Sequence, residues 1–321
     1  MDNDKRAATG RVATGQSGGA AVELTDLCHH YGERAALDGL SLTVARGEIF
    51  GLLGPNGSGK TTLFRVLSTL LPPQRGDARV LGVPLSGQTF EVRRRIGVVF
   101  QAPSLDKKLT VAENIHHQAA LYGVPKSQWR ERTAALLERF RLADRADERT
   151  ESLSGGLRRR AELAKGIVHQ PELLLLDEPS TGLDPGARAD LWQCLREFRD
   201  GGATIVLTTH LLEEAERCDR LGILDAGRLV ALGAPDELRS GLGGDSISLQ
   251  CERPEELALR IERDFQLSAQ VLDQQVRLEC EAGHQWVPRL VEAYGAEISS
   301  VRLGKPTLED VFIHYARRRW T

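Results

Sequence analysis

The octapeptide GPNGSGKT, residues 54–61, carries the clearest chemical signal in the chain. It matches the pattern GxxxxGK[ST], follows the apolar run IFGLL and opens a helical pattern, which is the context that gives this motif its meaning. Its glycines let the backbone curl until amide N–H groups point at phosphate oxygens, and a helix start adds partial positive charge. We therefore predict a phosphate-binding loop. Its expected ligand contacts are Gly54, Pro55, Asn56, Gly57, Ser58, Gly59, Lys60, Thr61 and Thr62.

Two acidic residues follow a second apolar run, in the segment LLLLDEP at residues 173–179. Asp177 is expected at the carboxyl end of a buried strand, where open α/β sheets bind their ligands. Its carboxylate and the hydroxyl of Thr61 are suited to Mg²⁺, while the ammonium of Lys60 can reach the β- and γ-phosphates. Glu178 is placed to be the general base that activates an attacking water. The pattern predicts hydrolysis of a nucleoside triphosphate.

A second anion-binding pattern lies much later in the chain, in SLSGGLRRR at residues 152–160. Ser154, Gly155 and Gly156 begin a helical pattern, so their N–H groups and the serine hydroxyl can form another anion cradle. One chain thus carries two phosphate-binding patterns, and the second needs an explanation.

The elements that must position these residues alternate along the first two thirds of the chain. Four apolar runs predict buried strands, and the last two are continuous, as expected for a sheet covered on both faces. Helical periodicity fills the intervals, so the pattern favours an α/β domain with a largely parallel sheet. The predicted strands are 49–53, 96–100, 172–177 and 203–210. The predicted helices are 60–70, 110–122, 127–140, 154–169 and 186–199.

Beyond the segment GLGGDS, residues 241–246, the order changes to β-α-β-β-α-β, which is typical of a ferredoxin-like fold. We interpret GLGGDS itself as a linker. A last helix follows, with Thr307 as its cap, Asp310 in its first turn, and one apolar face. The arginine run 317–319 is either a solvated helix end or a contact with membrane headgroups. The apolar face comprises Leu308, Val311, Phe312 and Tyr315.

Composition narrows the function classes. The chain has 321 residues, 41% hydrophobic and 27% charged, which is typical of a soluble globular protein of two domains. Its net charge of −3 gives no reason to expect a nucleic-acid partner. No run approaches the ~18 apolar residues of a membrane span, and the N-terminus lacks a secretory pattern. The five cysteines include no CxxC pair, so we expect reduced thiols rather than zinc or disulfides.

Taken together and in order, the motifs between residues 22 and 235 resemble those of one family, the ATP-binding cassette (ABC) ATPases. GPNGSGKT resembles its Walker A loop, LSGGL its signature, LLLLDEP its Walker B motif and STGLD its D-loop, with Asp184. Tyr31 stands where the family stacks an aromatic ring on adenine, although a half-buried packing tyrosine is an open alternative. Gln101 stands at the Q-loop, and His210 is the switch histidine.

The resemblance implies ATP and Mg²⁺ as ligands. Glu178, His210 and Gln101 are then the expected catalytic residues. The neutral amide of Gln101 can bond the metal shell and the water, and His210 can donate to a γ-phosphate oxygen. The expected metal ligands are Thr61, Gln101 and Asp177.

The resemblance also explains the second anion cradle, since in this family the signature of one cassette completes the nucleotide site of another. It therefore implies a second cassette, most simply in a C₂ homodimer. One departure is Leu157, where the family usually has glutamine; we expect activity with altered contacts beside the site. The arginines that follow form part of an interface, or at least one of them is a solvent-facing helix charge. They are Arg158, Arg159 and Arg160.

The implied fold is α/β, a P-loop NTPase of the ABC ATPase type with a helical signature subdomain, plus a small α+β ferredoxin-like domain. The expected division is a disordered lead-in at 1–20, the ATPase domain at 21–240 and an accessory domain at 241–321. Other segments, such as KPTLEDVFI at 305–313, resemble the daunorubicin-resistance-like exporter branch.

That branch implies docking on a separate transmembrane permease at the cytoplasmic face of the membrane, with membrane contact only through the permease. The alternative function is a soluble ABC-type ATPase with a regulatory or nucleic-acid-associated role.

Overall fold

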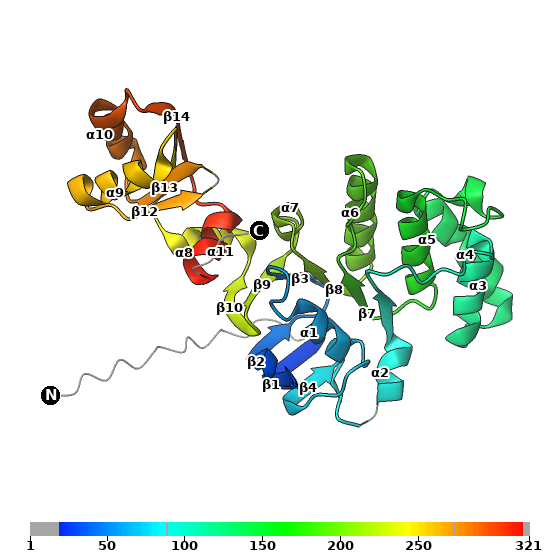
Figure 1. Ribbon diagram of the computed structural model, residues 1–321. Helices are drawn as coiled ribbons and strands as arrows, with labels where there is room; N and C mark the ends of the chain where they lie inside the picture. Colours follow the sequence, from blue (N-terminus) through cyan, green and yellow to red (C-terminus); the bar gives the residue numbers. More distant parts are fainter. Residues whose placement is uncertain (1–18, 88, 273, 317–321) are drawn as a thin grey trace.

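The computed structural model describes residues 19–87, 89–272 and 274–316. The predicted lead-in at 1–20 falls almost wholly outside these ranges, and so does the arginine run 317–319. Within them the chain forms three sheets and the helices around them (Figure 1).

The central sheet consists of six strands: β3 (Ile49–Leu53), β6 (Ile96–Val99), β7 (Leu173–Asp177), β8 (Thr204–Thr209), β9 (Arg220–Asp225) and β10 (Arg228–Gly233). Their order is β10-β9-β3-β8-β7-β6. All neighbouring pairs are parallel except β9 and β10. Every residue of β3, β7 and β8 is buried. The predicted, largely parallel sheet is confirmed, and burial of both faces explains its continuous apolar runs.

A second sheet is antiparallel and consists of β1 (Val22–Tyr31), β2 (Arg34–Val44), β4 (Arg75–Val80) and β5 (Val83–Pro84), in the order β2-β1-β4-β5. The sequence did not predict it, because these strands alternate rather than form apolar runs. In β1, for example, Val22 and Leu24 are buried while Glu23 between them is exposed. The turn between β1 and β2 places Tyr31 and Arg34 beside the phosphate loop.

The helices of this part of the chain are α1 (Lys60–Leu67), α2 (Thr89–Arg95), α3 (Val111–Leu121), α4 (Lys126–Arg139), the 3-10 helix η1 (Ala143–Arg145), α5 (Gly155–Ile167), α6 (Pro185–Asp200), α7 (Leu212–Ala215) and α8 (Pro235–Leu242). The five predicted helices are confirmed with shifted ends. Helices α3, α4 and α5 gather beside α6, away from the antiparallel sheet (Figure 1). This group corresponds to the expected helical subdomain.

The C-terminal segment forms β11 (Asp245–Cys251), α9 (Pro254–Phe265), β12 (Ala269–Leu272), β13 (Gln275–Cys280), α10 (Gly283–Tyr294) and β14 (Ile298–Gly304). All its strand pairs are antiparallel, in the order β12-β13-β11-β14, and it has its own apolar core. The predicted β-α-β-β-α-β order is confirmed. The predicted linker at 241–246 is shorter than expected. Because α8 runs to Leu242 and β11 begins at Asp245, only Gly243 and Gly244 remain, both at positive φ.

The last helix, α11 (Leu308–Ala316), returns to the first part of the chain (Figure 1). Its buried residues Leu308, Val311 and Phe312 join the core cluster that also contains Leu238 of α8. The expected cap is confirmed, because the Asp310 N–H donates to the Thr307 hydroxyl and its carboxylate accepts from the Thr307 N–H, at 3.3 and 2.7 Å. Tyr315 is 41% exposed and lies outside this core. The boundary at residue 240 remains a prediction, but α11 packs on its N-terminal side.

Candidate nucleotide-binding site

The phosphate loop joins β3 to α1, and its glycines are required by geometry. Gly57 and Gly59 have φ values of 81° and 106°, which favour glycine. A Cβ atom on Gly54 would come within 2.4 Å of the Leu224 carbonyl oxygen, and one on Gly59 within 2.5 Å of the Ala36 carbonyl oxygen. The loop therefore packs too closely on neighbouring backbone for any larger residue at these positions.

Lys60 is the first residue of α1, directly after this loop, and is buried. Its Nζ atom donates to the carbonyl oxygens of Gly54 at 2.6 Å and Pro55 at 3.0 Å. Burial lowers the pKa of the Lys60 ammonium, and the negative charges of Glu178 and Asp177 oppose this shift without cancelling it. A phosphate would supply the strong negative charge that this buried cation lacks.

The hydroxyl of Ser58 is also buried in the loop, and it has no hydrogen-bond partner among the residues that the structure describes. Buried polar groups normally have partners, so an unmatched hydroxyl in a phosphate-type loop fits a site built for a polar ligand.

A cavity of about 320 Å³ opens over the loop. Its walls come from distant segments, namely the β1–β2 turn, the loop itself and the end of β7. Tyr31 is 47% exposed at its edge, with its ring 4.9 Å from that of His29. This exposure suits a ring that stacks on a ligand, but its role stays a prediction. The lining residues are Tyr31, Arg34, Ala36, Asn56, Gly57, Gly59, Lys60, Thr61, Thr62 and Glu178.

Arg34 is a cavity residue that the sequence did not point to. It follows Tyr31 across the turn, and its Nη2 atom lies 3.4 Å from the Gly57 carbonyl oxygen. No motif contains Arg34. Only its proximity to the aromatic candidate Tyr31 at a strand end offered a signal.

Two predicted catalytic residues, Gln101 and His210, converge on the carboxylate of the third, Glu178. Gln101 Nε2 donates to Glu178 Oε2 at 3.1 Å, and His210 Nδ1 lies 3.2 Å from Glu178 Oε1. The hydroxyl of Thr181 also donates to Oε2, at 3.3 Å. These residues follow the neighbouring strands β6, β7 and β8, whose carboxyl ends meet at one edge of the sheet. The structure therefore brings Gln101, Glu178 and His210 together as predicted.

Asp177 ends β7 and is buried, with its Oδ1 atom accepting a 2.5 Å hydrogen bond from the Thr208 hydroxyl. Burial raises the pKa of this carboxyl group, and the Thr208 hydrogen bond opposes that effect. The described residues contain no group of three or more His, Cys, Asp or Glu side chains that could hold a metal ion. Mg²⁺ usually takes one or two carboxylates plus water and substrate phosphates, so the single carboxylate of Asp177 is compatible with this ion, and the set of Asp177, Thr61 and Gln101 stays a prediction.

The signature residues do not line the cavity over the phosphate loop. Ser154 is the N-cap of α5 and accepts a 3.3 Å hydrogen bond from the Leu157 N–H. Ser154 and Gly155 are exposed and line no part of the cavity over the phosphate loop. Asp184 caps α6 in the same manner, accepting from the Ala187 N–H at 2.9 Å, and this bond lowers its pKa. Both helix starts are therefore formed and open, but separate from the chain's own phosphate loop.

The three arginines after the signature differ in exposure, and both interpretations stay open for Arg158 and Arg160. Arg158 is partly exposed, and Arg160 lies 3.6 Å from Asp190 of α6. Arg159 is 8% exposed and points inward, so for this residue both the interface and the solvent-facing interpretations were wrong. Its guanidinium donates to the carbonyl oxygen of Pro179, among others, which is a contact that local periodicity does not reveal.

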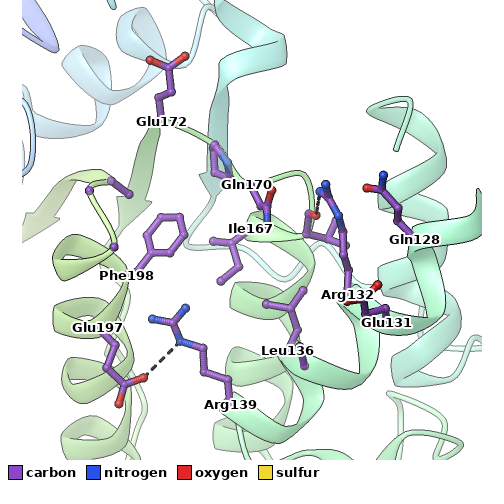
Figure 2. Close-up of a pocket in the computed structure, with 16 residues that line it drawn as sticks. Gln128, Glu131, Arg132, Leu136, Arg139, Ile167, Gln170, Glu172, Glu197 and Phe198 are labelled. Carbon is purple, nitrogen blue, oxygen red and sulfur yellow. Dashed lines mark hydrogen bonds and ion pairs between the residues drawn. The ribbon is translucent and has the colours of Figure 1, made fainter. Parts of the chain in front are cut away.

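A larger cavity of about 870 Å³ lies between α4 and the ends of α5 and α6 (Figure 2). Its apolar lining includes Leu136, Ile167 and Phe198, and Arg139 pairs with Glu197 at its wall at 3.3 Å. None of the predicted site residues lines it. The size of a cavity therefore does not identify the candidate nucleotide site. The smaller cavity is the one lined by predicted site residues, including Lys60 and Glu178.

Comparison with known proteins places these motifs in a family. The family model described as ABC transporter matches residues 37–181. The chain is 43% identical to the daunorubicin resistance ATP-binding protein DrrA3 of Streptomyces coeruleorubidus, over 88% of this chain and 92% of that one. It is 45% identical to the Nod factor export ATP-binding protein I of Paraburkholderia xenovorans (strain LB400), over 76% of this chain and 80% of that one.

Solved structures agree with the fold. The ATP-binding subunit of an ABC transporter superposes with a TM-score of 0.64 at 33% identity, over 70% of this chain and 93% of that one. The ADP conformation of another ATP-binding cassette gives 0.62 at 26% identity, over 68% and 92%. In the part of the chain that the structure describes, no helix has the length and apolar character needed to cross a membrane.

Proposed function

Because the chain belongs to the ATP-binding proteins of ABC transporters, we propose that it binds and hydrolyses ATP to drive export through a separate membrane permease. The observation that carries this proposal is the convergence of Gln101 and His210 on the Glu178 carboxylate, beside the cavity over the phosphate loop. A nucleotide-binding cassette without catalysis would not need this arrangement.

Binding begins with the loop. The Lys60 ammonium, now bonded to the Gly54 and Pro55 carbonyl oxygens, turns to the β- and γ-phosphates, and the loop N–H groups surround them. Tyr31 stacks on the adenine. Thr61, Gln101 and Asp177 would hold Mg²⁺, which neutralises phosphate charge when bound.

Hydrolysis then uses the Glu178 carboxylate as general base. It accepts a proton from water as the water oxygen attacks the γ-phosphorus and the bond to the leaving ADP oxygen breaks. Gln101 orients the water, since its amide already reaches the carboxylate. His210 donates a hydrogen bond to a γ-phosphate oxygen, where negative charge must be stabilised.

The exposed signature supports a dimer. Ser154, Gly155 and Gly156 offer a helix start to solvent, and Asp184 lies at the neighbouring start of α6. We expect these residues to contact the ATP of a second cassette, so that two chains enclose two ATP molecules in C₂ symmetry. Contacts of the γ-phosphate with both chains then favour the closed dimer, and loss of the γ-phosphate on hydrolysis allows the dimer to open.

The exporter role rests on the relatives, which are named for daunorubicin resistance and for Nod factor export. We propose that this chain docks, through the segment after Gln101, on a permease at the cytoplasmic face of the membrane. The substrate path then lies in the permease.

The test is to express the chain with and without any polytopic membrane protein that is found encoded beside its gene. We expect Mg²⁺-dependent ATP hydrolysis by the purified chain, and recovery in the membrane fraction only when the permease is present. Recovery with ribosomes or DNA, independent of any membrane protein, would overturn the transport role while leaving the ATPase activity to be judged separately.

A further inference from the structure

Arg159 is a buried arginine on α5, five residues beyond the signature serine, and its side chain is 9% exposed. Arginine stays protonated in proteins, so burying it is costly unless its five N–H donors are satisfied. Here they meet backbone carbonyl oxygens and one carboxylate, which is an unusually complete set of partners for a side chain outside the nucleotide cavity.

One group of these partners is the turn that carries the proposed base. Arg159 Nε donates to the Pro179 carbonyl oxygen at 2.9 Å, and Nη2 donates to that of Asp177 at 3.1 Å. Nη2 also lies 3.5 Å from the carbonyl oxygen of Glu178. The guanidinium therefore holds the backbone on both sides of Glu178.

The other group is the segment around Gln101. Arg159 Nη1 donates to the Phe100 carbonyl oxygen at 2.7 Å and to Glu162 Oε2 at 3.0 Å. Glu162 in turn accepts from the Ser104 N–H at 2.6 Å through Oε1. Helix α5 thus forms hydrogen bonds with the chain on both sides of Gln101, at Phe100 and Ser104.

The backbone of Glu178 needs such support. Its φ is 45°, a left-handed conformation that is unfavourable for a residue with a Cβ. Its N–H donates to the carbonyl oxygen and hydroxyl of Thr208 on β8, both at 3.1 Å. Arg159, on α5, holds the carbonyl groups of the same turn. The strained residue is held between the central sheet and the signature helix.

We propose that Arg159 is a positioning residue for ATP hydrolysis, because one guanidinium fixes the turn of Glu178 and the segment of Gln101 to the helix that Ser154 caps. It does not line the cavity over the phosphate loop and acts through Glu178 and Gln101. Any movement of α5 when the signature engages a second cassette then reaches both catalytic side chains. The inference rests on the proposed ATPase function.

A purely structural role makes a different prediction. If Arg159 only neutralised the buried Glu162, then Arg159→Lys would preserve that pairing and activity. Lysine has a single ammonium, however, and cannot donate in a fork to carbonyl groups of two segments. Arg159→Met alone would leave the Glu162 carboxylate buried and unpaired, so the informative apolar variant is the double substitution Arg159→Met/Glu162→Met.

The experiment measures kcat and KM for ATP, and Tm without nucleotide, for the full-length chain and both variants. We expect kcat to fall about 30- to 100-fold in each, because small misplacements of catalytic groups cost rates of this order. KM should stay within about twofold and Tm close to wild type. Arg196→Met, an exposed arginine of α6, is the matched control with unchanged kinetics.

A kcat within threefold of wild type in either folded variant would overturn the proposal. So would a loss of kcat that parallels a fall in Tm and a rise in KM, because that is the signature of general destabilisation. If one variant does not fold, the kinetics of the other variant decide between the two roles, and failure of both to fold assigns Arg159 a structural role. Absence of ATP hydrolysis in the wild-type chain would instead refute the proposed function itself.

Discussion

The phosphate loop and the signature segment both combine glycines with a helix start, yet their surroundings differ. The loop lies under a cavity whose walls come from the β1–β2 turn and the end of β7, and its Lys60 is buried. The signature has Ser154 and Gly155 exposed. Figure 1 shows α5 within the helical group, apart from α1, which follows the phosphate loop.

This difference indicates what the phosphate loop and the signature segment would each need from a second chain. The cavity over the loop has a carboxylate, an aromatic ring and a buried cation from its own chain, so we expect a single chain to bind a nucleotide. The signature has only N–H groups and a hydroxyl at a helix start, which bind an anion weakly unless something else encloses it. A second copy that presents its loop-bound ATP would complete both sites.

Glu178→Gln should lower kcat by about a thousandfold, because an amide cannot accept the proton from water. Gln101 and the phosphate loop remain, so ATP binding should survive and the closed dimer should accumulate with Mg-ATP. Hydrolysis rates and light scattering after gel filtration check both points. Glu213→Gln, which alters only an exposed pair with Arg188, is the control. Near-normal turnover in Glu178→Gln would refute the assignment of the base.

Ser154→Arg should lower hydrolysis by at least about a hundredfold while leaving ATP binding by a single subunit within about twofold. The bulky cation blocks the signature from a neighbour's nucleotide and removes the α5 cap, but it leaves the chain's own cavity intact. Fluorescent-nucleotide titration and ATPase rates separate the two effects. Ser299→Arg, on the exposed surface of β14, should change neither. Loss of monomer binding would argue against the split site.

Tyr31→Ala should weaken ATP binding about tenfold, since stacking of a base on an aromatic ring contributes about 1–3 kcal/mol. Tyr31→Phe keeps the ring and should bind like wild type. The measurement is the Kd for ATP at constant salt. Equal affinity in both variants would mean that Tyr31 only packs against His29, the alternative that the sequence left open.

Asp177→Asn should stabilise the nucleotide-free chain while it abolishes Mg²⁺-dependent hydrolysis. Burial raises the folded-state pKa of Asp177, so the folded chain binds this proton more tightly than the unfolded chain. Its cost to stability is therefore absent below the ordinary pKa of 3.8 and appears as pH rises through the raised value.

At pH 7 we expect Tm to rise by about 2 °C in Asp177→Asn, and the gain to shrink as the pH falls toward 4. Asp144→Asn, at an exposed position of η1, should show no such gain. A gain that is independent of pH would contradict the burial of a charged carboxylate as the cause.

Much of the site could be predicted because its signals are local. The phosphate loop needs glycines at two positive-φ positions and a helix start directly after a buried strand, and these requirements fall within one octapeptide. The strand ends that carry Gln101, Glu178 and His210 follow recognisable apolar runs. Parallel strands then bring their ends to one edge, so the grouping of these three residues follows from the fold class.

Other features have no local signal. The antiparallel sheet, which carries Tyr31 and Arg34, has alternating strands in place of the apolar runs that mark the central sheet. Helix α8 extends into the glycine-rich segment that was predicted to be a linker. The apolar face of α11 shares a core with α8, while Glu309 and Asp310 of α11 pair with Arg277 of β13. The periodicity of α11 indicated an apolar face but not the partner of that face.

Local spacing in the sequence determined the phosphate-type loop after β3 and the carboxylate that follows β7, because backbone dihedrals and strand ends follow from short patterns. Only the tertiary structure decided that Arg159 points inward. An arginine in a run of three has the same helical preference whether it faces solvent or core. Its direction is set by carbonyl groups of Phe100, Asp177 and Pro179, which no local pattern brings into contact with it.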